Sequence, residues 1–148
     1  MSDLAKSLKV VLADTFKMYM LTHKYHLNVE GGDFYQYHKL FESIYDELWT
    51  SVDAIAEHIR ALDEYVPFSF GRFDELSSVE DDVKIPTASV MMERLLSTND
   101  IVLASLKAAV EQAKLANDEG VINFLGSRLE AHTKHGWFIR ATTKKSRE

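Results

Sequence analysis

The 148-residue sequence contains no cysteine, only two prolines and only six glycines. Without cysteine, the chain cannot form disulfides, zinc ribbons, iron–sulfur clusters or thiol nucleophiles. The scarcity of proline and glycine favours long uninterrupted elements. No apolar run approaches the roughly 20 residues that span a bilayer, and the N-terminus lacks the apolar core of a signal peptide. The sequence therefore predicts a cytoplasmic protein that is not inserted in a membrane.

The composition is typical of a globular domain. Apolar residues make up 46% of the chain and charged residues 27%, a balance that favours a packed core over disorder. The length suits one domain, and neither a repeat nor a low-complexity stretch divides the chain, so we expect a single domain over residues 1–148. The formal net charge of −6 argues against nucleic-acid binding by the surface as a whole.

Apolar residues recur at spacings of three and four along four long segments, which predicts amphipathic helices. We expect these helices to run from an Asp3 cap to about Asn28, from an Asp33 cap to about Leu62, from Pro86–Thr87 to a turn at 117–120, and from that turn to about Thr142. Residues 63–86 break the pattern and are interpreted as a long crossover with a short helix near Phe73–Ser77. This order is typical of the ferritin-like four-helix bundle, an all-α fold.

The same spacings predict which faces form the core. The strictest stripe runs from Phe41 to Leu62 in the second helix. On the first helix the predicted face is Leu12, Phe16, Tyr19, His23 and His26.

Three of the six histidines lie in "HKYHLNVEGGDFYQYH", residues 23–38, on both sides of a Gly31-Gly32 break. A single histidine on an apolar helical face is usually a core residue. His26, however, ends one predicted helix and His38 lies near the start of the next, so an antiparallel hairpin brings both imidazoles towards one place. The other four are interpreted as structural or surface residues: His23, His58, His132 and His135.

Asp53 and Glu57 lie four residues apart on the second helix, so their carboxylates share a face and could hold one cation together. Taken alone, two acids on a helix surface are more often simply solvated. His38 and Asp53 are separated by about 22 Å of helical rise, whereas the ligand atoms of a shared metal lie about 2.0–2.3 Å from it. Either the two pairs are separate, or one site closes between two chains.

A two-fold dimer with antiparallel second helices would close such a site. His26 and His38 of one chain would face the carboxylates of its partner, in two equivalent copies. Two nitrogens and two carboxylates suit Fe(II) and leave open positions for an oxidant. The Glu-x-x-His motif of intrasubunit di-iron centres does not occur in the chain.

The stretch from His26 to Leu62 resembles the signature of the Dps family, DNA-binding proteins from starved cells. The family pattern is H-x-N-V-x-G, then a histidine twelve residues after the first, then D-x-x-x-E. These positions are occupied here by His26, His38, Asp53 and Glu57. Glu42 matches a position where the family carries an acidic residue near the same metal, and "DEGVINFLGSRLEAHTKHGWFIR" is similar to the family's fourth helix.

The resemblance implies a hollow dodecamer that oxidises Fe(II) at its two-fold interfaces, usually with hydrogen peroxide in preference to dioxygen, and stores ferric mineral inside. Consuming both reactants suppresses hydroxyl-radical damage. The resemblance also implies the metal ligands, which would bind iron, or zinc as a substitute: His26, His38, Glu42, Asp53 and Glu57. All of these except Glu42 would also be catalytic.

The chain departs from the family near the metal site and near the pore through which iron enters the shell. Leu27 replaces a Trp that often follows the first ligand, which affects local electron donation rather than metal binding. Asp118 and Glu119 match acidic residues of the pore, whereas Asn123 replaces a frequent Asp, so slower passage of iron is expected.

DNA is the less favoured partner. Many DNA-binding members carry a Lys-rich N-terminal tail, whereas this sequence has only Lys6 and Lys9 near its start, in a predicted helix, and each chain is net negative. Lys144, Lys145 and Arg147 near the C-terminus could still contact DNA weakly in many copies, which would associate the protein with the nucleoid. The alternative function is a DNA-binding or purely structural cage without significant ferroxidase activity. A third alternative is a bundle whose histidines never meet a metal.

Overall fold

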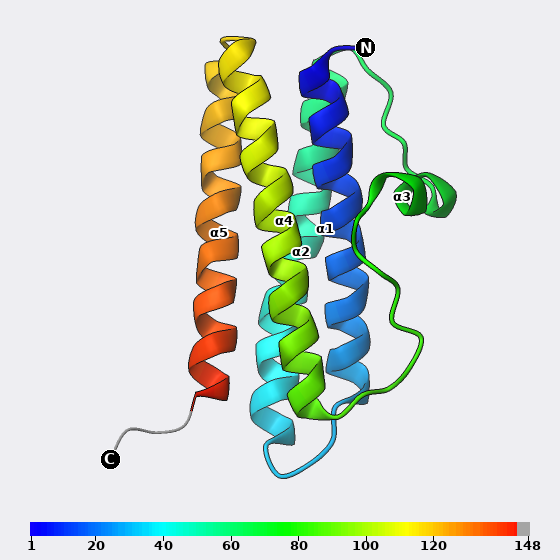
Figure 1. Ribbon diagram of the computed structural model, residues 1–148, viewed down its shortest axis with the longest axis vertical. Coiled ribbons are helices and arrows are strands. Elements are labelled where there is room, and N and C mark those ends of the chain that lie inside the picture. Colours follow the sequence, from blue (N-terminus) through cyan, green and yellow to red (C-terminus); the bar gives the residue numbers. More distant parts are fainter. Residues whose placement is uncertain (145–148) are drawn as a thin grey trace.

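The computed structural model describes residues 1–144 and shows an all-α bundle. Its helices are α1 (Asp3–Asn28), α2 (Phe34–Ala61), α3 (Phe70–Leu76), α4 (Ala88–Leu115) and α5 (Glu119–Thr143). The four long helices run side by side along the long axis, and the crossover that carries α3 passes along the outside of α1 (Figure 1). The predicted fold class and the long crossover are confirmed. No helix within residues 1–144 has the length and hydropathy of a bilayer-spanning segment.

Two of the predicted helix caps differ in detail. The Ser2 hydroxyl accepts a hydrogen bond from the backbone N–H of Ala5 at 3.1 Å, so Ser2 is the N-cap of α1 in place of the predicted Asp3. Asp33 does occupy the N-cap position of α2, but its side chain makes no cap hydrogen bond. Serine and aspartate are both good caps, so the spacing alone could not choose between Ser2 and Asp3.

The short helix of the crossover begins earlier than predicted. It spans Phe70–Leu76 and not Phe73–Ser77, because the Ser69 hydroxyl accepts from the backbone N–H of Arg72 at 3.3 Å and starts the helix there. The helix packs on α1 through Phe73, whose ring centroid lies 4.7 Å from that of Phe16.

The core stripe predicted on α2 is confirmed at Phe41, Leu48, Val52, Ile55 and Ile59, all of which are buried. On the face predicted for α1, Leu12 and His26 are buried, while Phe16, Tyr19 and His23 are partly buried. Further core residues of α1 are Leu8, Met18 and Tyr25. Since α1 packs against α2, α3 and α4, it carries more than one apolar stripe, and only one of them faces the centre of the bundle.

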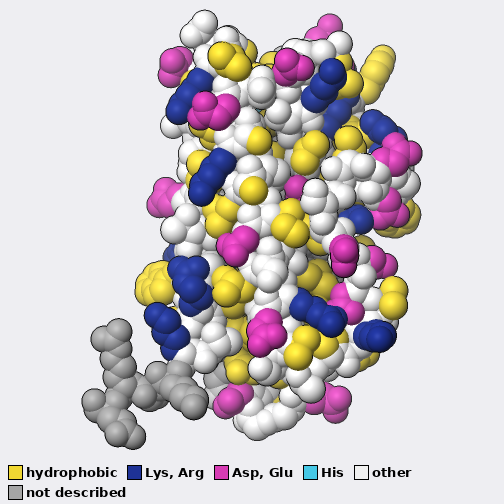
Figure 2. Space-filling view, viewed as in Figure 1, with side chains coloured by type: hydrophobic (Ala, Val, Ile, Leu, Met, Phe, Trp, Pro, Cys, Tyr) yellow, Lys and Arg dark blue, Asp and Glu magenta, His cyan; other side chains and the backbone are white. Residues whose placement is uncertain are grey.

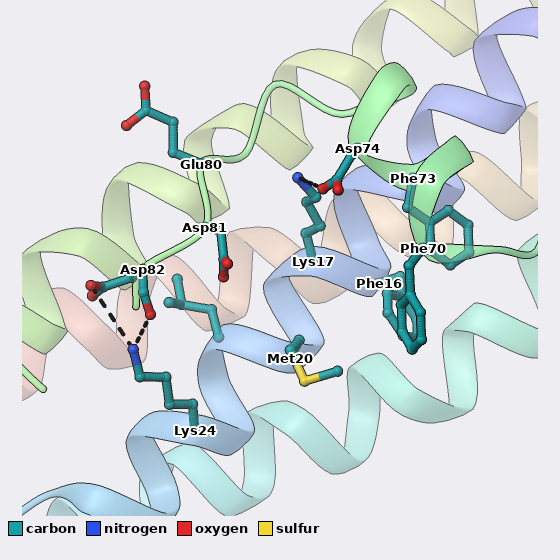
Figure 3. Close-up of a pocket in the computed structure, with 11 residues that line it drawn as sticks. Phe16, Lys17, Met20, Lys24, Phe70, Phe73, Asp74, Glu80, Asp81 and Asp82 are labelled. Atoms are coloured by element: carbon teal, nitrogen blue, oxygen red, sulfur yellow. Dashed lines mark hydrogen bonds and ion pairs between the residues drawn. The ribbon is translucent and has the colours of Figure 1, made fainter. Parts of the chain in front are cut away.

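Ion pairs hold the crossover against α1 and α4. Lys17 contacts Asp74 at 2.7 Å, and Asp82 receives hydrogen bonds from Tyr25 at 2.6 Å and Arg94 at 2.7 Å. Figure 3 shows Lys17 and Lys24 on α1 directed towards Asp74 and Asp82, beside a pocket of about 250 Å³. The two lysines of this pocket hold the crossover against α1.

Candidate metal centre

Two reciprocal hydrogen bonds join the histidines of the α1–α2 hairpin. Nδ1 of His26 lies 2.8 Å from the carbonyl oxygen of His38, and Nδ1 of His38 lies 2.8 Å from the carbonyl oxygen of His26. A carbonyl oxygen only accepts, so each Nδ1 carries the hydrogen and each neutral ring keeps its lone pair on Nε2. The rings stack with their centroids 3.8 Å apart. The structure therefore brings the two histidines together in the tautomer that binds a metal through Nε2.

The turn between the helices makes this pairing possible. Gly31 has φ of +121°, a conformation that side chains rarely adopt, so glycine is required where the chain reverses. Val29 is buried, and its backbone N–H donates to the carbonyl of Tyr25 at 3.0 Å, which closes the end of α1. The hairpin is thus tied at both sides of the glycine, and the two histidines face each other across it.

The predicted carboxylate ligands form a second, separate cluster. Asp53 and Glu57 are exposed on α2. The pKa of Glu57 is raised, first by a hydrogen bond with Asp53 and then by the negative charge of Asp53. A bound cation would relieve the repulsion between two carboxylates in this arrangement.

The structure does not bring the two halves together within one chain. His38 and Asp53 lie on the same straight helix, about 22 Å apart along its axis. Within residues 1–144, no group of three or more histidine, aspartate and glutamate side chains is close enough to hold an ion. Glu42 lies one turn after His38, half-buried and 3.3 Å from Lys39, so it belongs to the histidine half. Both alternatives that the sequence left open therefore remain: two separate pairs of side chains, or one site shared between two chains.

Exposed apolar side chains surround the carboxylate half. Trp49 is 54% exposed and Phe68 is 56% exposed. Both line one shallow hollow together with Asp53. An adjoining hollow adds Met20 and Phe70 from α1 and α3. A contiguous apolar patch of this kind marks an interaction surface more often than a bare solvent face.

The residues predicted for the pore and for DNA lie at the two ends of α5. Asp118 caps the helix by accepting from the backbone N–H of Val121 at 3.1 Å, while Glu119 and Asn123 are exposed. Lys144 is exposed at the other end. Lys145 and Arg147 lie outside the described residues. Figure 2 shows basic and acidic side chains intermixed on the face presented, with a small group of basic ones beside the C-terminal half of α5.

Sequence reasoning missed a buried polar network that joins α2 to α5. The Glu47 carboxylate accepts from Nε2 of His135 at 2.7 Å and from both Nη atoms of Arg128, one of them at 3.0 Å. Burial raises the pKa of Glu47, but the hydrogen bonds from His135 and Arg128 outweigh it and lower that pKa to about 2. The signal in the sequence was three polar residues on the core face of α5, Arg128, His132 and His135.

His132 completes this network and confirms its interpretation as a structural histidine. Its Nδ1 donates to Oδ1 of Asn99 at 2.8 Å, and its Nε2 accepts from Arg128 at 3.2 Å. Burial and then the charge of Arg128 lower its pKa to about 3. Both ring nitrogens are used, so this imidazole has no lone pair to offer a metal.

Comparisons with known proteins agree on one family. Residues 5–148 match the ferritin-like domain family. The DNA protection during starvation protein 2 of Bacillus anthracis is 30% identical over 130 residues, which are 88% of this chain and 89% of that protein. The structure of a Dps protein from Vibrio cholerae, described as one of the ferritin-like diiron-carboxylate proteins, is 28% identical with a TM-score of 0.91, covering 95% of this chain and 89% of that one. Dps from Staphylococcus aureus is 26% identical with a TM-score of 0.92 and covers 97% of both chains.

Proposed function

The chain belongs to the Dps family of ferritin-like proteins, and from this premise we propose that it oxidises Fe(II) at sites shared between two copies. The family supports a role in iron storage. In the proposal, hydrogen peroxide is the preferred oxidant and dioxygen a slower one. Twelve copies form a hollow shell that keeps the ferric product inside, and the consumption of Fe(II) and peroxide together limits hydroxyl-radical damage.

The observation that carries the proposal is the pair of unengaged Nε2 atoms on His26 and His38. Within the described residues, no hydrogen bond uses either atom, whereas both Nδ1 atoms are held by main-chain carbonyls. Asp53 and Glu57 of the partner subunit would complete the ligand set, since two-fold symmetry with antiparallel α2 helices places the halves opposite each other twice. Glu42 would adjust the site or bind a second ion.

The ligand types also suit the reaction. Neutral imidazoles and carboxylates bind Fe(II), and the negative carboxylates stabilise the higher charge of Fe(III) more strongly, which favours oxidation. One hydrogen peroxide accepts one electron from each of two Fe(II) ions and, with two protons from solvent, becomes two water molecules. Zinc accepts the same ligands, and its substitution for iron stays a prediction.

The apolar patch beside Asp53 supports the proposed dimer. Its exposed rings, Trp49, Phe68 and Phe70, come from α2, the crossover and α3. A partner chain that covered this patch would remove apolar surface from water, a gain of about 25 cal/mol for each Å². The same contact would carry its His26 and His38 towards the carboxylates of this chain.

A complementation experiment tests whether the site is shared. His26→Ala and Asp53→Ala chains are produced separately and by coexpression, loaded anaerobically with Fe(II), and mixed with peroxide or air while ferric absorbance is recorded. Each variant alone should oxidise Fe(II) no faster than protein-free buffer does. Coexpression should restore about one quarter of the wild-type sites, because half of randomly formed dimers are mixed and each contains one intact site.

The contrary outcomes are distinct. If the mixed assembly forms but regains no activity, the halves do not meet across the dimer. If the wild-type protein oxidises iron no faster than buffer with either oxidant, the proposed ferroxidase is wrong, and the DNA-binding or structural-cage alternative is favoured. DNA binding through Lys144 and its neighbours, a pore at Asp118, Glu119 and Asn123, and a cytoplasmic or nucleoid-associated location stay predictions.

A further inference from the structure

Phe34, the first residue of α2, is a large apolar side chain that lies outside the bundle core. It is 42% exposed, although exposure of apolar surface to water is unfavourable. Its ring lies nearly parallel to that of His38, with the centroids 4.9 Å apart and 25° between the planes. Within residues 1–144, no other aromatic ring stacks on Phe34. The contact with His38 therefore sets this ring apart from the aromatic residues of the core.

Phe34 extends the paired imidazoles of the hairpin into a stack of three rings. The rings of His38 and His26 lie 3.8 Å apart with 15° between their planes. The rings of Tyr45 and His23 also approach His26, but each is inclined to it by 69°. Phe34 is thus the ring that presents a nearly parallel π face to the histidine pair.

Metal binding would change the charge of the stacked imidazoles. A metal ion at Nε2 withdraws electrons from the ring, so the ring becomes more positive, and iron(III) has a stronger effect than iron(II). Two positive rings held face to face repel each other. The face of a phenyl ring is negative, and a cation within about 6 Å of its centroid is stabilised. The His38 ring lies inside this distance from Phe34.

Resting on the function proposed above, we propose that Phe34 raises the metal affinity of the shared site by stabilising the positive charge on metal-bound His38. The orientation of the His38 ring is already fixed by its Nδ1 hydrogen bond, so the contribution of Phe34 is electrostatic. Phe34 acts through His38, exchanges no electron, and is neither a ligand nor a catalytic group. Because the effect grows with the charge of the bound ion, it also favours the oxidation of Fe(II) to Fe(III).

Fluorinated phenylalanines test the proposal, since they keep the approximate shape of the ring while fluorine withdraws the negative charge from its face. The variants are Phe34→4-fluorophenylalanine and Phe34→pentafluorophenylalanine in the full chain, and anaerobic Co(II) binding is titrated by its visible absorption. We expect the pentafluoro ring to weaken Co(II) binding by about three- to tenfold, with the monofluoro ring in between. Urea midpoints of the metal-free variants should equal that of the wild type.

A second histidine–phenylalanine stack supplies the matched control. Phe124 stacks on His58 at 4.1 Å, and His58 is not among the proposed ligands, so Phe124→pentafluorophenylalanine should leave Co(II) affinity unchanged. Phe34→Leu keeps an apolar side chain without a π face and should bind Co(II) as weakly as the pentafluoro variant. With Fe(II) and peroxide, the Fe(II) concentration that gives half the maximal rate should rise in the same order, and the maximal rate should fall.

Three results would overturn the role of Phe34 while leaving the ferroxidase intact. The first is a Co(II) affinity, or a half-saturating Fe(II) concentration, that does not follow the degree of fluorination at Phe34. The second is an equal loss of affinity from fluorination at Phe124. The third is a parallel loss of metal-free stability, which would make the contact structural. A wild type that binds no Co(II) and forms ferric product no faster than buffer would instead overturn the proposed function, and the role of Phe34 with it.

Discussion

The molecule contains two pairs of histidines, one in the α1–α2 hairpin and one between α2 and α5, that differ in what their nitrogens do. His26 is 7% exposed and His135 is 8% exposed, so burial does not separate them. In the network between α2 and α5, His132 uses both ring nitrogens and His135 donates to Glu47. In the hairpin, each ring is anchored by Nδ1 alone. The hairpin pair is therefore distinguished by two stacked rings that both leave Nε2 unengaged within the described residues, and not by the density of histidines.

Removing the Glu47 carboxylate should cause the largest loss of stability. Glu47→Ala leaves Arg128 and His135 without their acceptor, and breaking a buried ion pair costs about 3–5 kcal/mol. The Glu47 side chain is 34% exposed, so with solvent screening we expect a loss of about 2–3 kcal/mol in the free energy of unfolding. Urea denaturation at one protein concentration measures it. Glu130→Ala, an exposed acid of α5, is the control, and equal midpoints for the two variants would contradict the comparison.

Acid should weaken the same network. The pKa of folded His132 is about 3, below its ordinary value of 6.5, so the unfolded chain binds a proton that the folded chain does not. Stability is therefore complete above pH 6.5 and falls as the pH drops towards 3, by roughly 2 kcal/mol between pH 7 and 4.5. Glu47, with its lowered pKa of about 2, adds a further loss only below about pH 5.

Urea midpoints measured between pH 7 and 4.5 check this expectation. His132→Gln should be less stable at pH 7 and should show a shallower dependence on pH than the wild type. His58→Gln serves as the matched histidine removal, since His58 stacks on Phe124 away from the network. If His132→Gln keeps the full pH dependence, another group is responsible for it.

The smallest effect is expected at Asp53. Because Asp53 is exposed and repels Glu57, Asp53→Ala should change the metal-free stability by less than about 0.5 kcal/mol, with a tendency to increase it. Anaerobic Fe(II) should raise the midpoint of the wild type and leave that of the variant unchanged, since only a ligand that binds the native state stabilises it. If Asp53→Ala instead loses as much stability as Glu47→Ala, Asp53 and Glu57 have a structural role. The contrast between the carboxylate pair and the Glu47 network then disappears.

The predictable features are those that depend on local spacing. The α2 stripe was found because Phe41 to Ile59 repeat regularly on one face, and the two ligand pairs were found because His26/His38 and Asp53/Glu57 are close in sequence. The network was missed because Arg128 bonds Glu47 across 81 positions of the chain, which no local pattern encodes. The tautomers of the hairpin histidines depend on main-chain carbonyls, so they required coordinates. The metal-binding roles of these residues stay predictions.

The anchors of the hairpin histidines have an evolutionary consequence. Each Nδ1 bonds to a backbone carbonyl, and every residue type has one, so replacing one imidazole does not deprive the other of its acceptor. Neighbouring residues can then be substituted without changing the orientation of the remaining ring. Leu27, which is 67% exposed beside His26, illustrates such a tolerant position. Gly31 is the opposite case, because any other residue would strain the turn that places those carbonyls. Over generations we expect Gly31 to persist while the residue next to His26 varies.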